Sequence, residues 1–321
     1  MISPNQKGLA PIAIVLVFAV LSAGIFFEYV HPKRINTKTT IAAVLPVLPS
    51  STLSPTPSTT PTPIVTPNPT PKPAVTPIPT AAPAPNNNPP GAGFSRQTVS
   101  VEGQNYNVAI IAADLNSTKV IVDTASDSDC SNNCPVLSLA DYVGRNGAYA
   151  GINGSFFCPP EYPGCTGKTN SFDTLLMNKN KHYFNSDNNV YSTVPAAIFS
   201  AGSARFVGRS LEWGRDTGVD SVIANYPLLV AGGNINFTEA PNEPKFGQRG
   251  ARGFIATKGN MVYIGDVFNA TMGESAKVMK AMGMDNALNL DEGGSTALWF
   301  GGSYKAGPGR NIPNAILFVN R

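Results

Sequence analysis

The residues best suited to chemistry lie in residues 289–296, Asn-Leu-Asp-Glu-Gly-Gly-Ser-Thr. An apolar strand is predicted just before two carboxylates and four small residues, which are Asp291, Glu292, Gly293, Gly294, Ser295 and Thr296. Carboxylates can move protons, and paired glycines let backbone N–H groups approach a ligand closely. A tight turn with an aspartate cap is the structural alternative for the same segment.

A second candidate segment follows another apolar strand, predicted at residues 148–152. It begins with Asn153 and Gly154 and continues into Ser155, Phe156 and Phe157. The aromatic rings could stack on the face of a sugar. The alternatives are an ordinary Asn-Gly turn and ordinary core phenylalanines.

Three arginines lie at irregular points of the chain. Arg249 and Arg252 precede a predicted strand, and Arg310 lies in Gly-Pro-Gly-Arg-Asn. An arginine held in such a place can bind a phosphate or carboxylate through two parallel hydrogen bonds. Three of them near polar turns favour an anion site.

Other chemistries are excluded by the residues that are missing. Residues 96–321 contain one histidine, His182, and neither a G-x-S-x-G nor an H-E-x-x-H motif. Acid–base work therefore falls to carboxylates. Asp291 and Glu292 could ligate a divalent cation, but two adjacent acids are a weak indication of one, so no cofactor is predicted and the metal question stays open. No basic stripe indicates a nucleic-acid surface.

Strands dominate the elements that must position these residues. Strands are predicted at 97–101, 106–112 and 119–122 (an antiparallel meander), 196–199, 204–207, 221–224, 226–230, 254–257, 261–264, 287–290 and 315–319. Helices are predicted at 137–143 and at 272–282, the latter ending at Gly283. Residues 158–193 read as a long loop. The fold class is therefore α+β, with a mixed, strand-dominated sheet and few helices.

The four cysteines, Cys130, Cys134, Cys158 and Cys165, cluster in one part of the chain. Their spacing differs from the C-x2-C pairs of zinc ribbons, and prolines lie between the last two, so two structural disulfides are favoured over a zinc site. Local pairing and crossed pairing are both open.

The N-terminal third of the sequence predicts a membrane-tethered protein with a single folded domain. Residues 9–27 are uncharged and apolar, long enough for a membrane helix, and a cleavable signal peptide is the alternative. A Pro/Thr-rich stretch follows that cannot bury a core. The predicted organisation is a membrane anchor at 1–34, a disordered stalk at 35–95 and one domain at 96–321.

The predicted orientation places the domain on the extracytoplasmic side. The cysteines and the stalk favour that side, whereas Lys33, Arg34 and Lys38 after the apolar run favour the opposite one. Five basic residues and one acid precede residue 96, and 18 basic and 19 acidic residues lie in residues 96–321, so the positive charge lies on the membrane side and the domain itself is close to neutral.

Taken in order, several segments resemble the phosphodiester glycosidase family. They are residues 151–157 (Gly-Ile-Asn-Gly-Ser-Phe-Phe), 226–230 (Tyr-Pro-Leu-Leu-Val), 252–255 (Arg-Gly-Phe-Ile), 287–296 and 310–315 (Arg-Asn-Ile-Pro-Asn-Ala). The resemblance covers most of residues 96–321. It departs at Glu292, where the family has a glycine, and it leaves Arg249 and Arg252 competing for one family arginine, with Arg252 preferred because an apolar strand follows it directly.

The resemblance implies hydrolysis of a sugar-1-phosphodiester in envelope or exopolysaccharide glycans. Asp291, Arg252 and Arg310 would be catalytic, and Asn153, Gly154, Phe156 and residues 292–296 would bind substrate. A phosphomonoester is a good leaving group, so charge neutralisation by arginine matters more than proton donation. The alternative is a non-catalytic module that binds phosphorylated envelope glycans.

Overall fold

The computed structural model describes residues 84–185, 193–238 and 244–321. The predicted anchor, and the predicted stalk up to residue 83, lie outside these ranges. Among the described residues, no helix is both long and apolar enough to cross a membrane. The domain falls within one compact unit, Pro77–Arg321.

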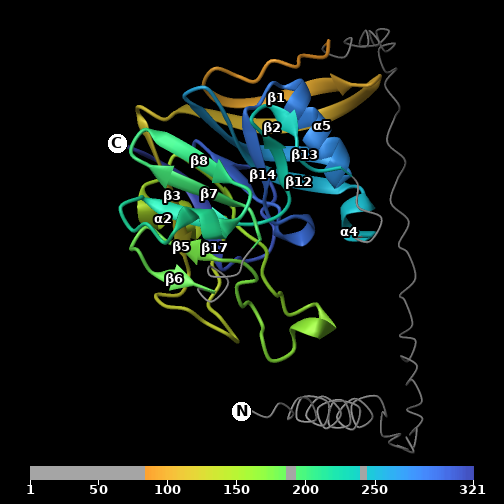
Figure 1. Cartoon of the computed structure of the whole chain (residues 1–321). Helices are drawn as coiled ribbons and strands as arrows, with labels where there is room; N and C mark the ends of the chain where they lie inside the picture. Colours follow the sequence, from red (N-terminus) through yellow and green to blue (C-terminus); the bar gives the residue numbers. More distant parts are fainter. Residues whose placement is uncertain (1–83, 186–192, 239–243) are drawn as a thin grey trace, which may run out of the picture. The chain divides into compact units, whose positions relative to one another are not determined.

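Three antiparallel sheets build the domain (Figure 1). The seven-stranded sheet has the order β1 (Gly93–Val101), β2 (Gln104–Asp114), β13 (Met261–Ala270), β12 (Gly250–Lys258), β14 (Asn286–Asn289), β10 (Leu228–Ala231) and β11 (Asn234–Ile235). One five-stranded sheet has the order β16 (Ser303–Ala306), β15 (Leu298–Phe300), β4 (Ala150–Asn153), β17 (Asn314–Asn320) and β3 (Thr118–Thr124). The other has the order β6 (Tyr183–Phe184), β5 (Leu176–Met177), β9 (Ser221–Ala224), β7 (Ala196–Ser200) and β8 (Ser203–Val207).

The strand-dominated α+β class is confirmed, with two corrections of detail. Every strand pair among the described residues is antiparallel, so the sheets are not mixed. The predicted three-strand meander is also wrong in its last member, because β1 and β2 form a hairpin while β3 pairs with β17. Sequence periodicity predicts a strand but does not indicate which distant strand it pairs with.

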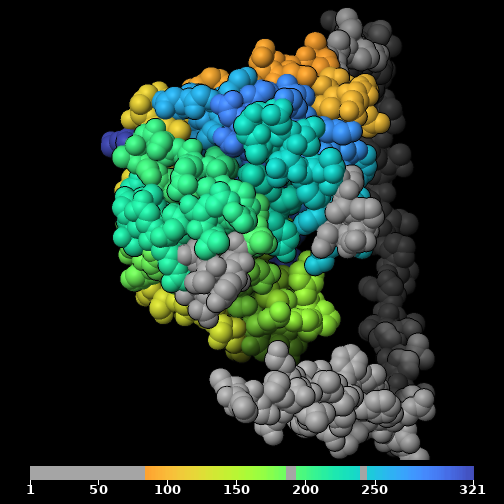
Figure 2. Space-filling model, in the orientation of Figure 1, coloured from red at the N-terminus to blue at the C-terminus, as the bar shows by residue number. Residues whose placement is uncertain are grey.

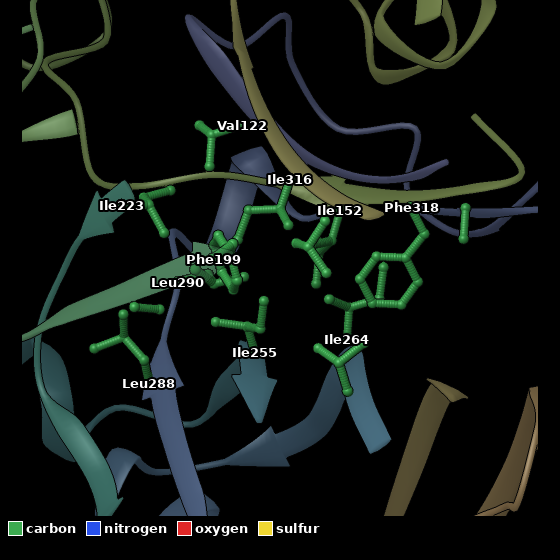
Figure 3. Close-up of a cluster of buried hydrophobic side chains, with 14 of the residues drawn as sticks. Val122, Ile152, Phe199, Ile223, Ile255, Ile264, Leu288, Leu290, Ile316 and Phe318 are labelled. Carbon is green, nitrogen blue, oxygen red and sulfur yellow. The ribbon is translucent and has the colours of Figure 1, made fainter. Parts of the chain in front are cut away.

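A single apolar core joins the three sheets. It includes Ile264 and Leu288 from the seven-stranded sheet, Ile152 and Ile316 from the second sheet, and Phe199 from the third, each at most 1% exposed. Figure 3 shows these side chains converging between the strands. Removing this much apolar surface from water is the main force that holds the sheets together.

Helices cover the outer faces. Helix α5 (Met272–Ala281) begins with a capping box, in which Thr271 Oγ1 accepts from the Glu274 N–H and Glu274 Oε2 accepts from the Thr271 N–H. Met272, Ala276 and Met279 pack it on the seven-stranded sheet. Helix α2 (Leu139–Asn146) packs on the sheet that contains β17, and α4 (Pro244–Gly247) is a single short turn.

The cysteine-rich region is more structured than the sequence predicts. Disulfides join Cys130 to Cys134 and Cys158 to Cys165, which confirms disulfide bonding and selects the local pairing. Within the predicted loop 158–193, residues 163–165 form a 3-10 turn, and β5 and β6 pair as short strands. At the other end, Asn86 and Asn87 already hydrogen-bond to Thr98 and Ser100, so ordered contacts begin before residue 96.

Candidate active site

A pocket of about 790 Å³ opens beside the 289–296 segment. We call it the Asp291 pocket. Its lining comes from five parts of the chain: residues 156–173, Tyr226, residues 244–246, the group Asp291, Glu292 and Ser295, and Arg310. Figure 2 shows a notch on this face between the yellow-green loop region and the cyan segment that contains α4. The volume is typical of a small-ligand site.

Four buried asparagines lock the strand ends beneath the pocket. Asn153 ends β4, Asn225 follows β9, Asn289 ends β14 and Asn314 begins β17, and each is at most 1% exposed. Such amides satisfy backbone groups that the sheets leave unpaired. All three sheets therefore contribute one rigid floor.

Asn153 fixes the position of Asp291. Its side-chain amide donates to the Asp291 carbonyl oxygen at 2.7 Å, and its side-chain oxygen accepts from the Ala297 N–H at 3.0 Å. The Asp291 N–H in turn donates to the Gly154 carbonyl oxygen at 2.9 Å. A side chain at Gly154 would overlap the Asn314 amide, so only glycine fits there. Asn153 and Gly154 are thus adjacent to the pocket as supports of its floor.

Asp291 has the most strongly perturbed titration in the pocket. Burial raises its pKa to about 7, and the negative charge of Glu292 acts in the same direction. A hydrogen bond from Ser295, the Glu292 N–H and the Arg310 charge oppose this rise. The side chain lines the pocket, so a carboxyl that exchanges its proton near neutral pH faces a ligand space.

Arg310 lies beside Asp291 and also lines the pocket. Its backbone N–H donates to the Gly294 carbonyl oxygen at 2.8 Å. Its guanidinium lies directly against the Gly294 Cα, and a Cβ there would overlap it. Gly294 therefore lets an arginine from a distant loop approach the 289–296 segment. The side chain is 24% exposed, which leaves donors accessible to an anion.

Arg252 has a different environment. It is 3% exposed, and its guanidinium donates to the backbone carbonyls of Ala270, Lys245 and Gln248 and pairs with Glu292. In the described part of the chain, Arg252 is not one of the residues that line the Asp291 pocket. Arg249, the competing arginine, instead pairs with Glu274 at the start of α5. Of the two, Arg252 is the one that contacts the 289–296 segment.

Glu292 adopts extended backbone, with φ −144°, so its side chain creates no strain where the family has glycine. One carboxylate oxygen pairs with Arg252, and the other is buried without a partner among the described residues. Burial raises its pKa, while Arg252 and Lys245 lower it. Glu292 is also one of the residues that line the pocket.

An aromatic wall faces these charged groups. Phe156 and Tyr226 meet edge to face with ring centroids 5.0 Å apart, and Tyr226 meets Phe246 at 6.1 Å. Tyr162 is 51% exposed and lies on the loop closed by the Cys158–Cys165 disulfide, which we call the stapled loop. The Lys245 ammonium lies 5.3 Å from the centroid of its ring. Aromatic faces of this kind suit the apolar face of a sugar ring or an aromatic aglycone.

The structure therefore divides the predicted site residues. Phe156, Asp291, Glu292, Ser295 and Arg310 converge on the pocket. The others support it from behind or lie beside it, namely Asn153, Gly154, Arg252, Gly293, Gly294 and Thr296. Five further residues in or beside the pocket were not predicted from the sequence, namely Glu161, Lys168, Asp173, Lys245 and Phe246. Of these five, only Glu161 lies at a position that the sequence could have indicated, between Cys158 and Cys165.

Metal binding finds no support in the described ranges, where no group of three or more His, Cys, Asp or Glu side chains could hold an ion. The second hollow, of about 370 Å³, is lined by Asp129, Cys130, Ser131, Ser171, Phe172 and Asn185. Its lining contains no basic side chain. The chemistry is concentrated in the Asp291 pocket.

Comparison with solved structures supports this fold. The chain is similar to the catalytic domain of zebrafish N-acetylglucosamine-1-phosphodiester alpha-N-acetylglucosaminidase, described as auto-inhibited by its pro-peptide, with TM-score 0.57, 17% identity, and coverage of 75% of this chain and 87% of that one. A hypothetical protein from Synechocystis aligns with TM-score 0.48 and 13% identity, covering 71% of this chain and 62% of that chain. Comparison with curated proteins gave no match.

The family profile carries the assignment. The profile described as phosphodiester glycosidase matches residues 146–319, more than half of the chain and all of the 289–296 segment. The pocket lies within this range, with Asp291, Arg310 and their supporting asparagines. The chain therefore belongs to the phosphodiester glycosidase family, and it is a hydrolase of that type.

Proposed function

We propose that the protein hydrolyses a sugar-1-phosphodiester in an extracytoplasmic glycan, with Asp291 as the base and Arg310 as the phosphate ligand. One observation carries the proposal: a carboxyl with pKa about 7 and a partly exposed guanidinium interact in the same pocket, opposite an aromatic wall. A glycosidase acting on phosphodiesters needs these three features, for proton transfer, anion binding and sugar contact.

The reaction breaks the bond between the sugar C1 and the phosphate oxygen, and the bonding electrons leave with the phosphate. Water supplies the new oxygen at C1, and its proton passes to the Asp291 carboxylate. The departing phosphomonoester is stable as an anion, so it needs charge neutralisation, which Arg310 supplies, more than a proton donor. Ser295 and the Glu292 N–H hydrogen-bond to Asp291 and keep its carboxylate oriented.

The sugar is placed against the aromatic wall in this proposal. Phe156 and Tyr226 lie in the pocket on residues that follow β4 and β9, so the rigid floor fixes their positions as well as that of Asp291. The Phe156 N–H donates to the Asn225 side-chain oxygen at 3.0 Å, and the Asn225 amide donates to the Asn289 carbonyl oxygen at 2.8 Å. One hydrogen-bonded chain therefore joins the sugar wall to the strand that carries Asp291.

The extracytoplasmic location is part of the proposal. Two disulfides, Cys130–Cys134 and Cys158–Cys165, favour an oxidising compartment, and the apolar run 9–27 with its proline-rich stretch favours a tethered domain. Protease added to intact cells should digest the domain and leave cytoplasmic markers whole. Digestion only after lysis would contradict this placement.

The direct test uses a chromogenic sugar-1-phosphodiester and the variant Asp291→Asn. The wild type should release product, and the variant should lose about 10²–10⁴-fold in kcat with an unchanged unfolding transition. Asp127→Asn, on the exposed surface, is the matched control and should retain full turnover. Binding of the substrate with no turnover by the wild type would instead support a glycan-binding module.

A further inference from the structure

The stapled loop places the carboxylate of Glu161 against Arg310, the residue proposed to bind phosphate. Glu161 Oε2 lies 3.3 Å from Arg310 Nη1, and the two side chains are 57% and 24% exposed. Arg310 thus has two acidic neighbours of different kinds. Asp291 is held by the rigid floor, whereas Glu161 extends from the loop closed by Cys158–Cys165.

The loop keeps Glu161 next to Arg310, which lines the pocket. Besides the disulfide, the Tyr162 N–H donates to the Pro159 carbonyl oxygen at 3.2 Å, and the Cys165 N–H donates to the Tyr162 carbonyl oxygen at 2.9 Å. The Tyr162 ring also contacts the Lys245 ammonium. The backbone of Glu161 is therefore fixed while its exposed side chain can turn away, since an exposed ion pair contributes little to stability.

Charge separates the substrate of the proposed reaction from its product. A phosphodiester carries one negative charge, but the phosphomonoester that leaves carries about 1.5 to 2 at neutral pH, because its second pKa is about 6. Coulomb repulsion by a fixed carboxylate rises in proportion to the charge of the ligand. A carboxylate at Arg310 therefore weakens binding of the product more than binding of the substrate.

We propose that Glu161 is a specificity-determining residue that selects monoanionic phosphodiesters over dianionic phosphomonoesters at Arg310, and so helps the product phosphate to leave. This inference rests on the proposed function, because it needs Arg310 to bind phosphate. It adds a role for a residue outside the reaction centre. Glu161 does not touch the reacting atoms, and its removal leaves the Asp291 environment in place.

Equilibrium binding of two probes that contain no sugar tests the inference. The probes are phenyl phosphate, a monoester, and methyl phenyl phosphate, a diester, titrated by calorimetry at pH 7.5 and low salt. Glu161→Gln should lower the dissociation constant of the monoester by about tenfold and that of the diester by about threefold. High salt should reduce both effects. Glu161→Asp, which keeps the charge, should stay near the wild type. Glu212→Gln, which removes an exposed partner of Arg209, should change neither.

The outcomes separate the two proposals. An equal shift for both probes, or no shift, with binding that still depends on Arg310 would overturn the role of Glu161 and leave the proposed function standing. Binding of neither probe, or binding unaffected by Arg310→Gln, would overturn phosphate binding at Arg310 and both proposals with it. In turnover assays, Glu161→Gln should lower the inhibition constant of the product phosphate more than the KM of the diester.

Discussion

The pocket face of the 289–296 segment and the layer behind it contain the same residue types in opposite roles. On the pocket face, Asp291 and Arg310 interact while both remain accessible. Behind it, Arg252 is 3% exposed, is bound to three backbone carbonyls and pairs with one oxygen of the pocket residue Glu292. Accessibility of the donors and acceptors, rather than residue type, separates a group that binds a ligand from one that holds the fold.

A second contrast between the two regions concerns carboxyls. Burial raises the pKa of Asp266 to about 7, as it does for Asp291. Asp266, however, is fully buried on β13, and neither of its oxygens has a partner in the described ranges. It has no opening to a ligand. A raised pKa therefore marks a candidate catalytic group only where a cavity reaches it.

The largest effect that sharpens the comparison is expected at Arg310. Arg310→Gln removes the charge next to Asp291 and should lower kcat/KM by about 10²–10³-fold, with the unfolding transition within about 1 kcal/mol of wild type. Urea denaturation and the chromogenic assay measure the two quantities. Comparable losses of stability and activity would place Arg310 in the supporting layer instead.

Arg252 should show the reverse pattern. Arg252→Gln leaves the Glu292 carboxylate without its buried partner and should lower the free energy of unfolding by about 3–5 kcal/mol, while folded protein keeps turnover within about tenfold. Replacing both residues, with Arg252→Met and Glu292→Met, should recover much of the stability. A stable Arg252→Gln protein without turnover would show that Arg252 acts in the chemistry.

The pH profile tests the pocket carboxyl. The base form of Asp291 is the ionised one, and burial raises its pKa to about 7, so log kcat/KM should rise with pH up to about 7 and then level off. Below that value each pH unit should cost about tenfold. A profile that falls above pH 7 would make the protonated carboxyl the active form.

The last prediction concerns the stability contribution of Asp266. Its pKa is raised from 3.8 to about 7 by folding, so the folded chain binds the proton more tightly, and stability falls as pH rises from about 4 to 7. The asparagine of Asp266→Asn cannot ionise, so the variant should lack this loss of stability. Its free energy of unfolding should exceed that of the wild type by more at pH 8 than at pH 5. Urea unfolding at both pH values measures the gain, with Asp127→Asn as the control. Parallel pH dependence in Asp266→Asn and wild type would exclude the effect.

Local sequence patterns predicted the elements but not their pairing. Helix α5 is found where the predicted helix ends at Gly283, and β12 and β13 contain the strands predicted at 254–257 and 261–264. The partner of β3, by contrast, lies about two hundred residues later in β17, because the closure of that sheet depends on core packing. No local period contains that information.

The candidate site was predictable to a similar degree. Asp291 and Arg310 lie close in sequence to Gly293 and Gly309, both at positive φ, so the sequence marks them. Asp173 lies in a loop and Lys245 in the short helix α4, neither with a periodic or glycine pattern in the sequence, and only the folded chain brings them to the pocket. For Arg252, the resemblance implies a catalytic role, but the sequence does not show that its side chain is buried against the 289–296 segment.

The most direct measurement is to find which bond breaks. Hydrolysis of a sugar-1-phosphodiester in oxygen-18-labelled water should place the label on C1 of the released sugar, because water attacks carbon and the phosphate keeps its bridging oxygen. Mass spectrometry of both products reads the result. Label in the sugar, lost with Asp291→Asn, is the predicted outcome. Label in the phosphate would mean attack at phosphorus and would contradict the glycosidase mechanism proposed for Asp291 and Arg310.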